Sequence, residues 1–439
     1  MKKIYIFLSF CVFLGGSEVK FEGNLPELIL AAQSSNLAQI SNYEPQKAQL
    51  QKDAVKSAYM PSLRVEGGYS FLSGDINVLR PQRAATARAI LELAVYDGGK
   101  REALLSSLSH LSAAEILKNE EYQNLLAFNA TKLYFSFLSL GELATAKEGE
   151  INYLKNALNR LEKYYRAGLS DESEYEAVNA RYAMALAERL EITQNQNEIK
   201  NQIYALTGRD IEPVAGSRIA FLDDENSAPQ KSEKPELEAL RLNFAAALED
   251  EKITASETNP QIFIKNTYTF MRTHYDRNLL PAQYRSALEP YFDDFFKPNL
   301  NTNELILGFS WKAFDFGANK KRREIKRISA LQAKLNLDQK RLQNELNLAN
   351  IKNDLKTLEQ KIAAGKSALN SAQTSLNAVS KKYEAGLLGY VEFLNATAQS
   401  FSAGSALELS KSKFEIKKAE YLYERGGKIA ENIEKTERK

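Results

Sequence analysis

The sequence predicts a mainly α-helical protein with a smaller share of membrane-type β-structure, built as two structural repeats. Three observations predict this fold class: a motif that recurs far along the chain, two proline-free stretches of unusual length, and short segments of alternating apolar and polar residues. The chain has 439 residues, 26% charged and 44% apolar, as in ordinary folded proteins. Repeated runs of about 20 apolar residues are absent, which excludes a polytopic bundle of membrane helices.

The internal repeat is defined by two motifs that share one offset. Tyr165–Leu169 reads Tyr-Arg-Ala-Gly-Leu and returns as Tyr-Glu-Ala-Gly-Leu at Tyr383–Leu387, 218 residues later. Tyr96–Gly99, Tyr-Asp-Gly-Gly, is matched by Phe-Asp-Phe-Gly at Phe314–Gly317 with the same offset. Two matches at one separation of this length indicate a duplicated unit.

Each repeat is expected to run in the order helix, strand, strand, long helix, returning helix. The predicted divisions are a signal peptide at 1–17, repeat 1 at 18–207, a linker at 208–234, repeat 2 at 235–427 and a polar tail at 428–439. The predicted strands are 61–73, 86–97, 260–272 and 303–315, and the predicted helical hairpins are 99–207 and 317–425. Pro61 and Pro260 mark the points where the first helix of each repeat must stop, because proline disfavours helix in the residue before it.

The strand segments alternate with a period of two. Leu305, Leu307 and Phe309 share one face, while Glu304 and Gly308 share the other. Each strand has the roughly ten residues that cross a bilayer at a tilt. Four strands are too few for a soluble β-sandwich, and they cannot close a barrel alone. Open edges are not tolerated in lipid, so assembly is expected, and three copies would supply twelve strands.

The two proline-free stretches predict helices of about 68 residues, ~100 Å long at 1.5 Å per residue. Their apolar residues alternate in steps of three and four, the spacing of a coiled-coil seam. The seam of the second copy contains Ile351, Leu355, Leu358, Ile362, Gly365, Leu369, Ala372, Leu376, Val379 and Tyr383. Gly168 and Gly386 follow the last seam residues and are expected to end the helices.

The N-terminus has the pattern of a secretory signal: Lys2 and Lys3, an apolar core at Ile4–Leu14, and small residues up to Ser17. The only cysteine, Cys11, lies in this segment, and a lipidated Cys11 is the alternative interpretation. Without the signal, 56 basic residues face 56 acidic ones, which argues against a nucleic-acid partner.

Catalytic and cofactor motifs are absent from the sequence. His110 and His274 are not spaced as metal ligands, and no phosphate-binding or nucleophile-elbow motif is present. We therefore expect no enzyme, no cofactor and no metal site.

The order of elements and the duplicated Tyr-x-Ala-Gly-Leu, Asp-x-Gly and proline positions resemble the TolC family of outer-membrane efflux proteins. The resemblance covers about Pro26 to Gly427. It implies a homotrimer, with a 12-stranded β-barrel in outer-membrane lipid above a long α-helical barrel in the periplasm. It also implies passive export of drugs or other substrates, with an inner-membrane pump and a periplasmic adaptor (membrane fusion protein) as partners. The cargo is not specified by the resemblance.

The resemblance also suggests site residues. The turns at Gly168, Leu169, Ser170, Gly386 and Leu387 correspond to the tips that contact the adaptor. Acidic gate positions fall on Glu174 and Glu392, and Tyr383 corresponds to a gate tyrosine within reach of Glu174. The second acidic ring falls on the neutral Asn395, and Leu388 replaces the gate arginine of the family. The alternative for both glutamates is a solvated place in a first helical turn, where the helix dipole favours carboxylates.

Three further interpretations remain open from the residues. The basic cluster between Lys320 and Arg327 either faces lipid phosphates or is a solvated helix end. A periplasmic coiled-coil adaptor is the second function considered, although it should lack duplicated membrane strands. A trimeric adhesin is the third, but it should carry its barrel strands at the C-terminus.

Overall fold

The computed structural model describes residues 21–74, 77–168, 171–220 and 233–435. The predicted signal peptide with Cys11 lies outside these residues. The chain forms two compact units, which cut across the predicted repeats: unit 1 contains residues 1–43, 117–237 and 340–439, and unit 2 contains 44–116 and 238–339. Both units draw on both repeats, so the repeats are interleaved. None of the described helices combines the length and apolar character needed to cross a membrane.

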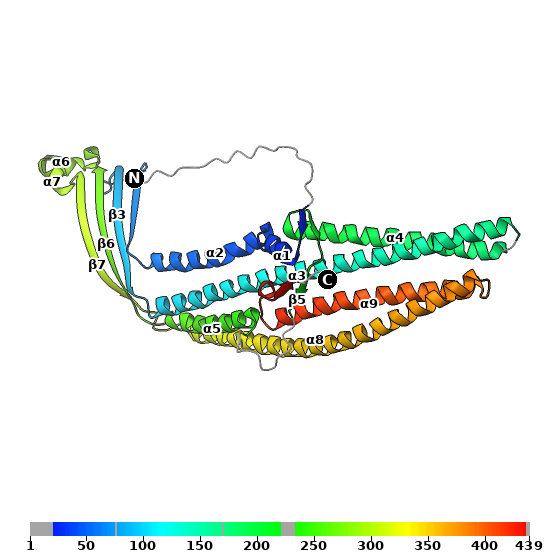
Figure 1. Cartoon of the computed structure of the whole chain (residues 1–439). Coiled ribbons are helices and arrows are strands. Elements are labelled where there is room, and N and C mark those ends of the chain that lie inside the picture. Colours follow the sequence, from blue (N-terminus) through cyan, green and yellow to red (C-terminus); the bar gives the residue numbers. More distant parts are fainter. Residues whose placement is uncertain (1–20, 75–76, 169–170, 221–232, 436–439) are drawn as a thin grey trace. The chain divides into compact units, whose positions relative to one another are not determined.

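Unit 2 contains an antiparallel sheet of four strands in the order β2-β3-β6-β7 (Figure 1). The strands are β2 (Ser62–Phe71), β3 (Arg83–Tyr96), β6 (Gln261–His274) and β7 (Asn299–Ser310). The two strands of each repeat are neighbours, and β3 pairs with β6 across the repeats, from Arg83↔His274 to Tyr96↔Ile262 with one bulge. The connection from β6 to β7 is the longer one and contains η1 (Arg277–Leu279), α6 (Ala282–Leu288), η2 (Glu289–Tyr291) and α7 (Phe292–Phe295).

The last strand ends earlier than the predicted 303–315. β7 stops at Ser310, which pairs with Gln261, the first residue of β6. The residue before Gln261 is Pro260, which has no N–H to continue the ladder. Beyond Ser310 the Trp311 indole N–H donates instead to the carbonyl of Thr258, at 3.0 Å.

Besides α6 and α7, unit 2 contains the parts of α2, α3, α5 and α8 that lie within its bounds. Their full ranges are α2 (Asn36–Ala58), α3 (Lys100–Arg166), α5 (Pro235–Ser256) and α8 (Ala318–Glu384). The first helix of repeat 1, expected as a single helix that stops before Pro61, is divided, because α1 (Leu25–Gln33) ends at Ser34 before α2 begins. Asn24 and Glu27 form a capping box that starts α1.

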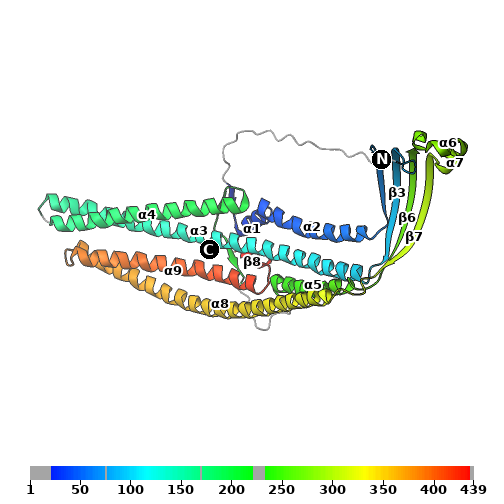
Figure 2. The same cartoon turned by 180° about the vertical axis from the view of Figure 1, so that it is seen from behind.

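Unit 1 contains two helical hairpins. One joins α3 to α4 (Glu172–Thr207), and the other joins α8 to α9 (Tyr390–Glu424). Figures 1 and 2 show α4 alongside α3 and α9 alongside α8. The predicted seam is largely buried, with Ile351, Leu355 and Leu376 nearly inaccessible. At Gly365 an added Cβ would lie 3.3 Å from Leu407 of α9, so glycine permits close approach of the two helices.

Two small sheets of unit 1 correct the predicted linker and tail. β1 (Phe21–Gly23) pairs with β4 (Ile211–Pro213), and β5 (Ser217–Ile219) pairs with β8 (Ile433–Lys435). Ile429, in η3 (Ile429–Glu431), is fully buried in the main apolar core. The segment expected as a polar tail is therefore packed as far as Lys435, because its isolated isoleucines fill sites made by distant parts of the chain.

Candidate functional site

The helical turns at the ends of the hairpins have the predicted glycine conformation. Gly168 and Gly386 adopt φ values of 71° and 70°, in the left-handed region that glycine enters without a Cβ penalty. The Gly386 and Leu387 N–H groups donate to the carbonyls of Tyr383 and Lys382, at 3.0 and 2.9 Å, which closes the end of α8. Leu387 is 73% exposed. Leu169 and Ser170 lie outside the described residues.

The predicted contact between Tyr383 and Glu174 is present. The Tyr383 hydroxyl donates to Oε1 of Glu174 at 3.1 Å, which joins α8 to α4. The Tyr383 ring stacks on Phe393 of α9, with ring centroids 4.7 Å apart. Burial, together with the negative charge and hydrogen bond of Glu174, raises the pKa of Tyr383. The phenol therefore remains a neutral donor throughout the physiological pH range.

The other two predicted gate residues are not brought to this contact. Glu392 and Asn395 are exposed on α9, and their side chains have no hydrogen bond or ion pair to any described residue. Glu392 lies in the first turn of α9, and its carboxylate is close to Gly389, with Oε2 3.1 Å from the position of an added Cβ. Within one chain, the structure thus places Tyr383 with Glu174 and leaves Glu392 and Asn395 free for solvent or other chains.

An apolar cluster packs the two hairpins together beside this contact. Its buried members are Ile151, Leu154, Ala157, Leu161, Val178, Ala185 and Phe393. They come from α3, α4 and α9, and Tyr383 of α8 packs against them. The hydrogen bond of Tyr383 therefore lies at the edge of a packed interface, so its geometry depends on how the hairpins meet.

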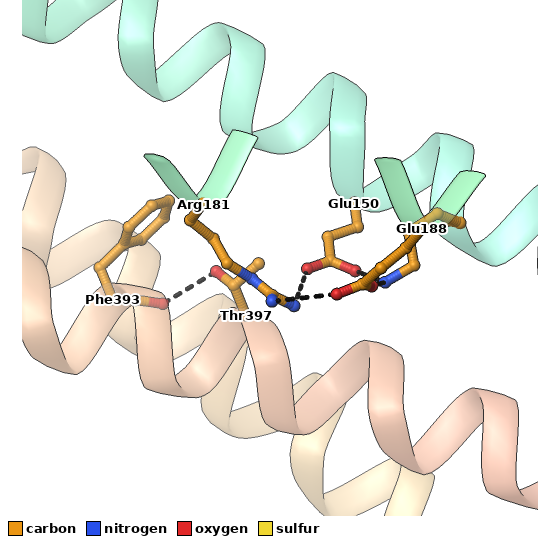
Figure 3. A network of polar contacts seen from close by, with 6 residues as sticks. Glu150, Arg181, Glu188, Phe393 and Thr397 are labelled. Carbon is orange, nitrogen blue, oxygen red and sulfur yellow. Dashed lines mark hydrogen bonds and ion pairs between the residues drawn. The ribbon is translucent and has the colours of Figure 1, made fainter. Parts of the chain in front are cut away.

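A buried charge network, which the sequence analysis missed, joins α3 to α4. Glu150 is only 1% exposed and lies 2.5 Å from both the Lys147 ammonium and the Arg181 guanidinium. Figure 3 shows Arg181 reaching both Glu150 and Glu188, with Phe393 and Thr397 of α9 close by. The available signal was spacing: Lys147 occupies the seam position equivalent to Gly365, and Glu150 directly precedes the seam residue Ile151.

Lys147 and Glu188 each favour the charged form of the other. Burial alone lowers the pKa of Lys147, but its hydrogen bonds to Glu150 and Glu188 outweigh burial and leave that pKa raised. The hydrogen bond from Lys147 lowers the pKa of Glu188 against the opposing effect of burial. Such a network stabilises one relative position of the two helices, because a displaced partner would leave Glu150 buried without its counter-charges.

A second ion pair links the two hairpins near the turns. Arg160 of α3 lies 3.2 Å from Glu384 of α8, and both side chains are partly exposed. Leu388 occupies the position where the resemblance implies an arginine. Arg160 therefore supplies a cationic link between the hairpins from a different helix.

The sheet of unit 2 has two chemically different faces, which follow from its register. Cross-strand partners place one mostly apolar set of side chains together: Leu63, Val65, Tyr69, Phe71, Ala87, Ala89, Leu91, Leu93, Ile262, Ile264, Tyr268, Phe270, Leu305, Leu307 and Phe309. The opposite face contains the directly opposed pairs Glu66↔Arg88 and Glu92↔Lys265. This confirms the predicted alternation, and an apolar face backed by a charged face is the pattern of an outer-membrane strand.

Comparisons with known proteins agree with this architecture. Residues 230–419 match the family model described as outer membrane efflux protein. The outer membrane protein TolC of Escherichia coli (strain K12) is 22% identical over 395 residues, covering 86% of this chain and 78% of TolC. The solved structure of VceC from Vibrio cholerae has a TM-score of 0.75 at 16% identity, covering 92% of this chain and 96% of VceC. The solved structure of CmeC from Campylobacter jejuni has a TM-score of 0.76 at 13% identity, covering 93% of this chain and 86% of CmeC.

The two-faced sheet and the long helical hairpins belong to a fold that these solved channel structures share over nearly the whole chain. In sequence and in fold the chain is similar to the TolC outer membrane efflux proteins. These similarities support a role in transport rather than in catalysis.

Proposed function

We propose that three copies of the chain form a passive exit duct in the outer membrane of a Gram-negative bacterium. Their sheets form a 12-stranded barrel, and their hairpins form a helical barrel in the periplasm. The observation that carries this proposal is the two-faced sheet with its two open edges. The apolar face suits lipid, and the charged face suits a water-filled lumen.

The directions of the edge strands support closure between copies. β2 runs away from the end of the sheet where α3 and α8 begin, and β7 runs toward that end. β7 of one copy can therefore pair antiparallel with β2 of the next. The same antiparallel pairing can repeat between all neighbouring copies in the ring. Because open edges are not tolerated in lipid, this closure supplies the missing partners. In a soluble coiled-coil adaptor, such an apolar sheet with open edges would have no function.

The hairpin turns are proposed to contact a periplasmic adaptor, through which an inner-membrane pump supplies the energy. Gly168, Leu169, Ser170, Gly386 and Leu387 form this contact set. The exposure of Leu387 supports it, because a large apolar side chain at the end of a hairpin is available to a partner helix.

Glu174, Glu392, Tyr383 and Asn395 are proposed to close the periplasmic end of the duct. The bond from Tyr383 to Glu174 holds α8 against α4 within each chain. The free carboxylate of Glu392 would meet its two symmetry mates near the axis, where three like charges repel anions and attract cations.

Planar-bilayer recording tests this function. We expect the purified trimer to form small, cation-selective channels, and Glu392→Gln to reduce the cation selectivity and enlarge the conductance. Glu359→Gln is the matched control, since Glu359 is an exposed glutamate of α8 outside the proposed gate. A protein that stays monomeric and forms no channels would contradict the duct. Channels indifferent to Glu392→Gln would contradict only the gate.

A further inference from the structure

The junction between β7 and α8, within unit 2, exposes two aromatic side chains. Phe314 is 74% exposed and Phe316 is 90% exposed, and their rings meet edge to face with centroids 4.6 Å apart. Phe316 has φ = 53°, and no other non-glycine residue in the described parts of the chain has a positive φ. A bulky residue in the left-handed region is strained, and water is a poor environment for its ring.

The first repeat shows that the turn itself does not require an aromatic residue. Gly98 is the equivalent of Phe316, and its φ of 77° comes without a Cβ penalty. A Cβ at Gly98 would lie 2.7 Å from the Cβ of Asn259, so that junction is closed by packing. The second junction is open at the same position and carries a phenylalanine.

Asp315 holds the two phenylalanines in this exposed position. Its carboxylate accepts the N–H of Gly317 at 3.0 Å and that of Asn319 at 2.7 Å, which caps the start of α8. The Asn319 side chain in turn donates to the Thr254 carbonyl of α5 at 2.7 Å. The junction is therefore tied to the body of unit 2, and the aromatic pair is presented from a fixed base.

Cationic residues flank the pair in the sequence. Lys312, Lys320 and Lys321 are exposed and have no ion-pair partner among the described residues. The basic residues that follow are different, because α5 neutralises several of them: Arg322 with Glu257, Arg323 with Glu251 and Lys326 with Asp250, at 3.3 to 3.5 Å.

The unpaired lysines are not explained by helix stability. Lys320 and Lys321 lie near the N-terminus of α8, where the helix dipole disfavours positive charge. At the equivalent points of the first repeat stand Glu102 and Ala103. The first turn of α3 also contains basic residues, Lys100 and Arg101, but Arg101 has partners within the chain, the Ala94 carbonyl and the Tyr59 ring. Two unpaired lysines at a place unfavourable to the helix indicate an external ligand of opposite charge.

We propose that Phe314, Phe316, Lys312, Lys320 and Lys321 form a junction anchor, which binds the headgroups of anionic glycerophospholipids in the periplasmic leaflet. This inference rests on the proposed function, since the apolar face of the sheet must lie in lipid. The junction follows Phe309 and Trp311 in the chain, at the end of the sheet from which α8 begins. The anchor would then lie at the depth where acyl chains give way to headgroups. Aromatic rings favour this depth, and lysines there attract lipid phosphates.

Fluorescence quenching tests the aromatic part. In a Trp311→Phe background, Phe316→Trp places the only tryptophan at the junction. After reconstitution into phosphatidylcholine–phosphatidylglycerol vesicles, we expect quenching by lipids brominated near the headgroup. Leu387→Trp in the same background is the control and should be quenched only by aqueous iodide. If iodide quenches the indole at position 316 as strongly as it quenches the control, the proposal is overturned.

Lipid retention tests the charged part. The trimer is extracted from the same vesicles, and the two retained lipids are quantified by mass spectrometry. Lys312→Gln/Lys320→Gln/Lys321→Gln is expected to reduce the enrichment of phosphatidylglycerol at least about fivefold, the effect of one lysine near an anionic surface. Lys356→Gln/Lys361→Gln/Lys366→Gln removes the same charge from exposed positions of α8 in unit 1 and should leave the enrichment unchanged.

Two outcomes would overturn the anchor while the duct stands. One is equal phosphatidylglycerol enrichment in the two triple variants, with normal conductance in both. The other is a Phe314→Ser/Phe316→Ser variant that loses its trimer but keeps its lipid enrichment, which would assign the rings to a contact between copies. Absent conductance in the unmodified protein would instead count against the proposed function.

Discussion

At the scale of single residues, three kinds of polar contact hold the helices of unit 1: two join the hairpins to each other, and the Glu150 network joins α3 to α4 within one hairpin. The hydrogen bond from Tyr383 to Glu174 lies at the edge of an aromatic stack. The Glu150 network is buried, so its charges require one another. The pair between Arg160 and Glu384 is partly exposed and contributes less. Opening of the hairpins should therefore begin at the weaker contacts near the turns.

Tyr383→Phe removes one hydrogen bond and keeps the ring that stacks on Phe393. We expect a loss of about 1 kcal/mol in the free energy that holds α8 against α4. Under the proposed gate the bond favours the closed arrangement, so channel conductance in planar bilayers should rise. Tyr165→Phe is the control at the equivalent position of the first repeat, and it should leave conductance unchanged. Equal conductance in Tyr383→Phe and the unmodified protein would show that this bond does not restrain the gate.

Glu188→Gln should change the response of the protein to acid. The pKa of Glu188 is below its ordinary value of 4.5, so the folded chain binds fewer protons there than the unfolded chain. Its stabilising contribution is thus present above pH 4.5 and is lost as pH falls through the lowered pKa.

The measurement is the thermal unfolding midpoint as a function of pH, followed by circular dichroism. Glu188→Gln should have a lower midpoint at neutral pH and a smaller further decrease below pH 4.5 than the unmodified protein. Glu191→Gln, at an exposed position of α4, should follow the unmodified curve. A parallel decrease in Glu188→Gln and the unmodified protein would contradict the role of this carboxylate.

At the scale of elements, the boundaries are set by side chains that replace backbone hydrogen bonds. Asp97 and Asp315 occupy equivalent positions in the two repeats and cap the long helices. Asp97 accepts the N–H of Arg101, and Asp315 accepts those of Gly317 and Asn319. The sheet has a different local requirement, namely room for an aromatic ring on its charged face. Gly308 of β7 provides this room directly opposite Phe263 of β6.

Gly308→Ala should destabilise the sheet. The added Cβ would lie 2.4 Å from Cζ of Phe263, and the ring must move from its place over β7. We expect a cost of about 1–3 kcal/mol, typical of overpacking, measured as a lower denaturant midpoint. Gly68→Ala on β2 is the matched control, because nothing lies within 4 Å of its added Cβ. Similar midpoints for the two variants would mean that the Phe263 ring is free to turn away.

At the scale of the whole molecule, the four strands of the sheet and the two helical hairpins are expected to function only as part of an assembly. The sheet has an apolar face and open edges at β2 and β7, which one chain cannot satisfy in lipid. The central strands β3 and β6 already have partners on both sides. The edge strands should therefore meet between chains, and the central strands should meet only within a chain.

Cysteine cross-linking distinguishes these strand contacts. The only natural cysteine, Cys11, lies in the predicted signal peptide and can be replaced. A series of variants with one cysteine on β2 and one on β7 should include pairs that oxidise to covalent dimers and trimers on denaturing gels. Leu91→Cys/Asn266→Cys, which are register partners on β3 and β6, should cross-link only within a single chain. Monomers alone across the whole β2–β7 series would contradict closure between copies.

The sequence alone determined the elements of this protein and their order, because each depends on local chemistry. Alternation set the strands, three-four spacing set the long helices, and glycines set the turns at Gly168 and Gly386. The hydrogen bond between Tyr383 and Glu174 followed from a family resemblance carried by a local motif. Only the tertiary structure decided which repeats share a unit, where β7 ends and how Ile429 and β8 are packed. It also revealed the Glu150 network and the strained Phe316. Each of these depends on a surface supplied by residues far away in the sequence, and no local periodicity encodes such a partner.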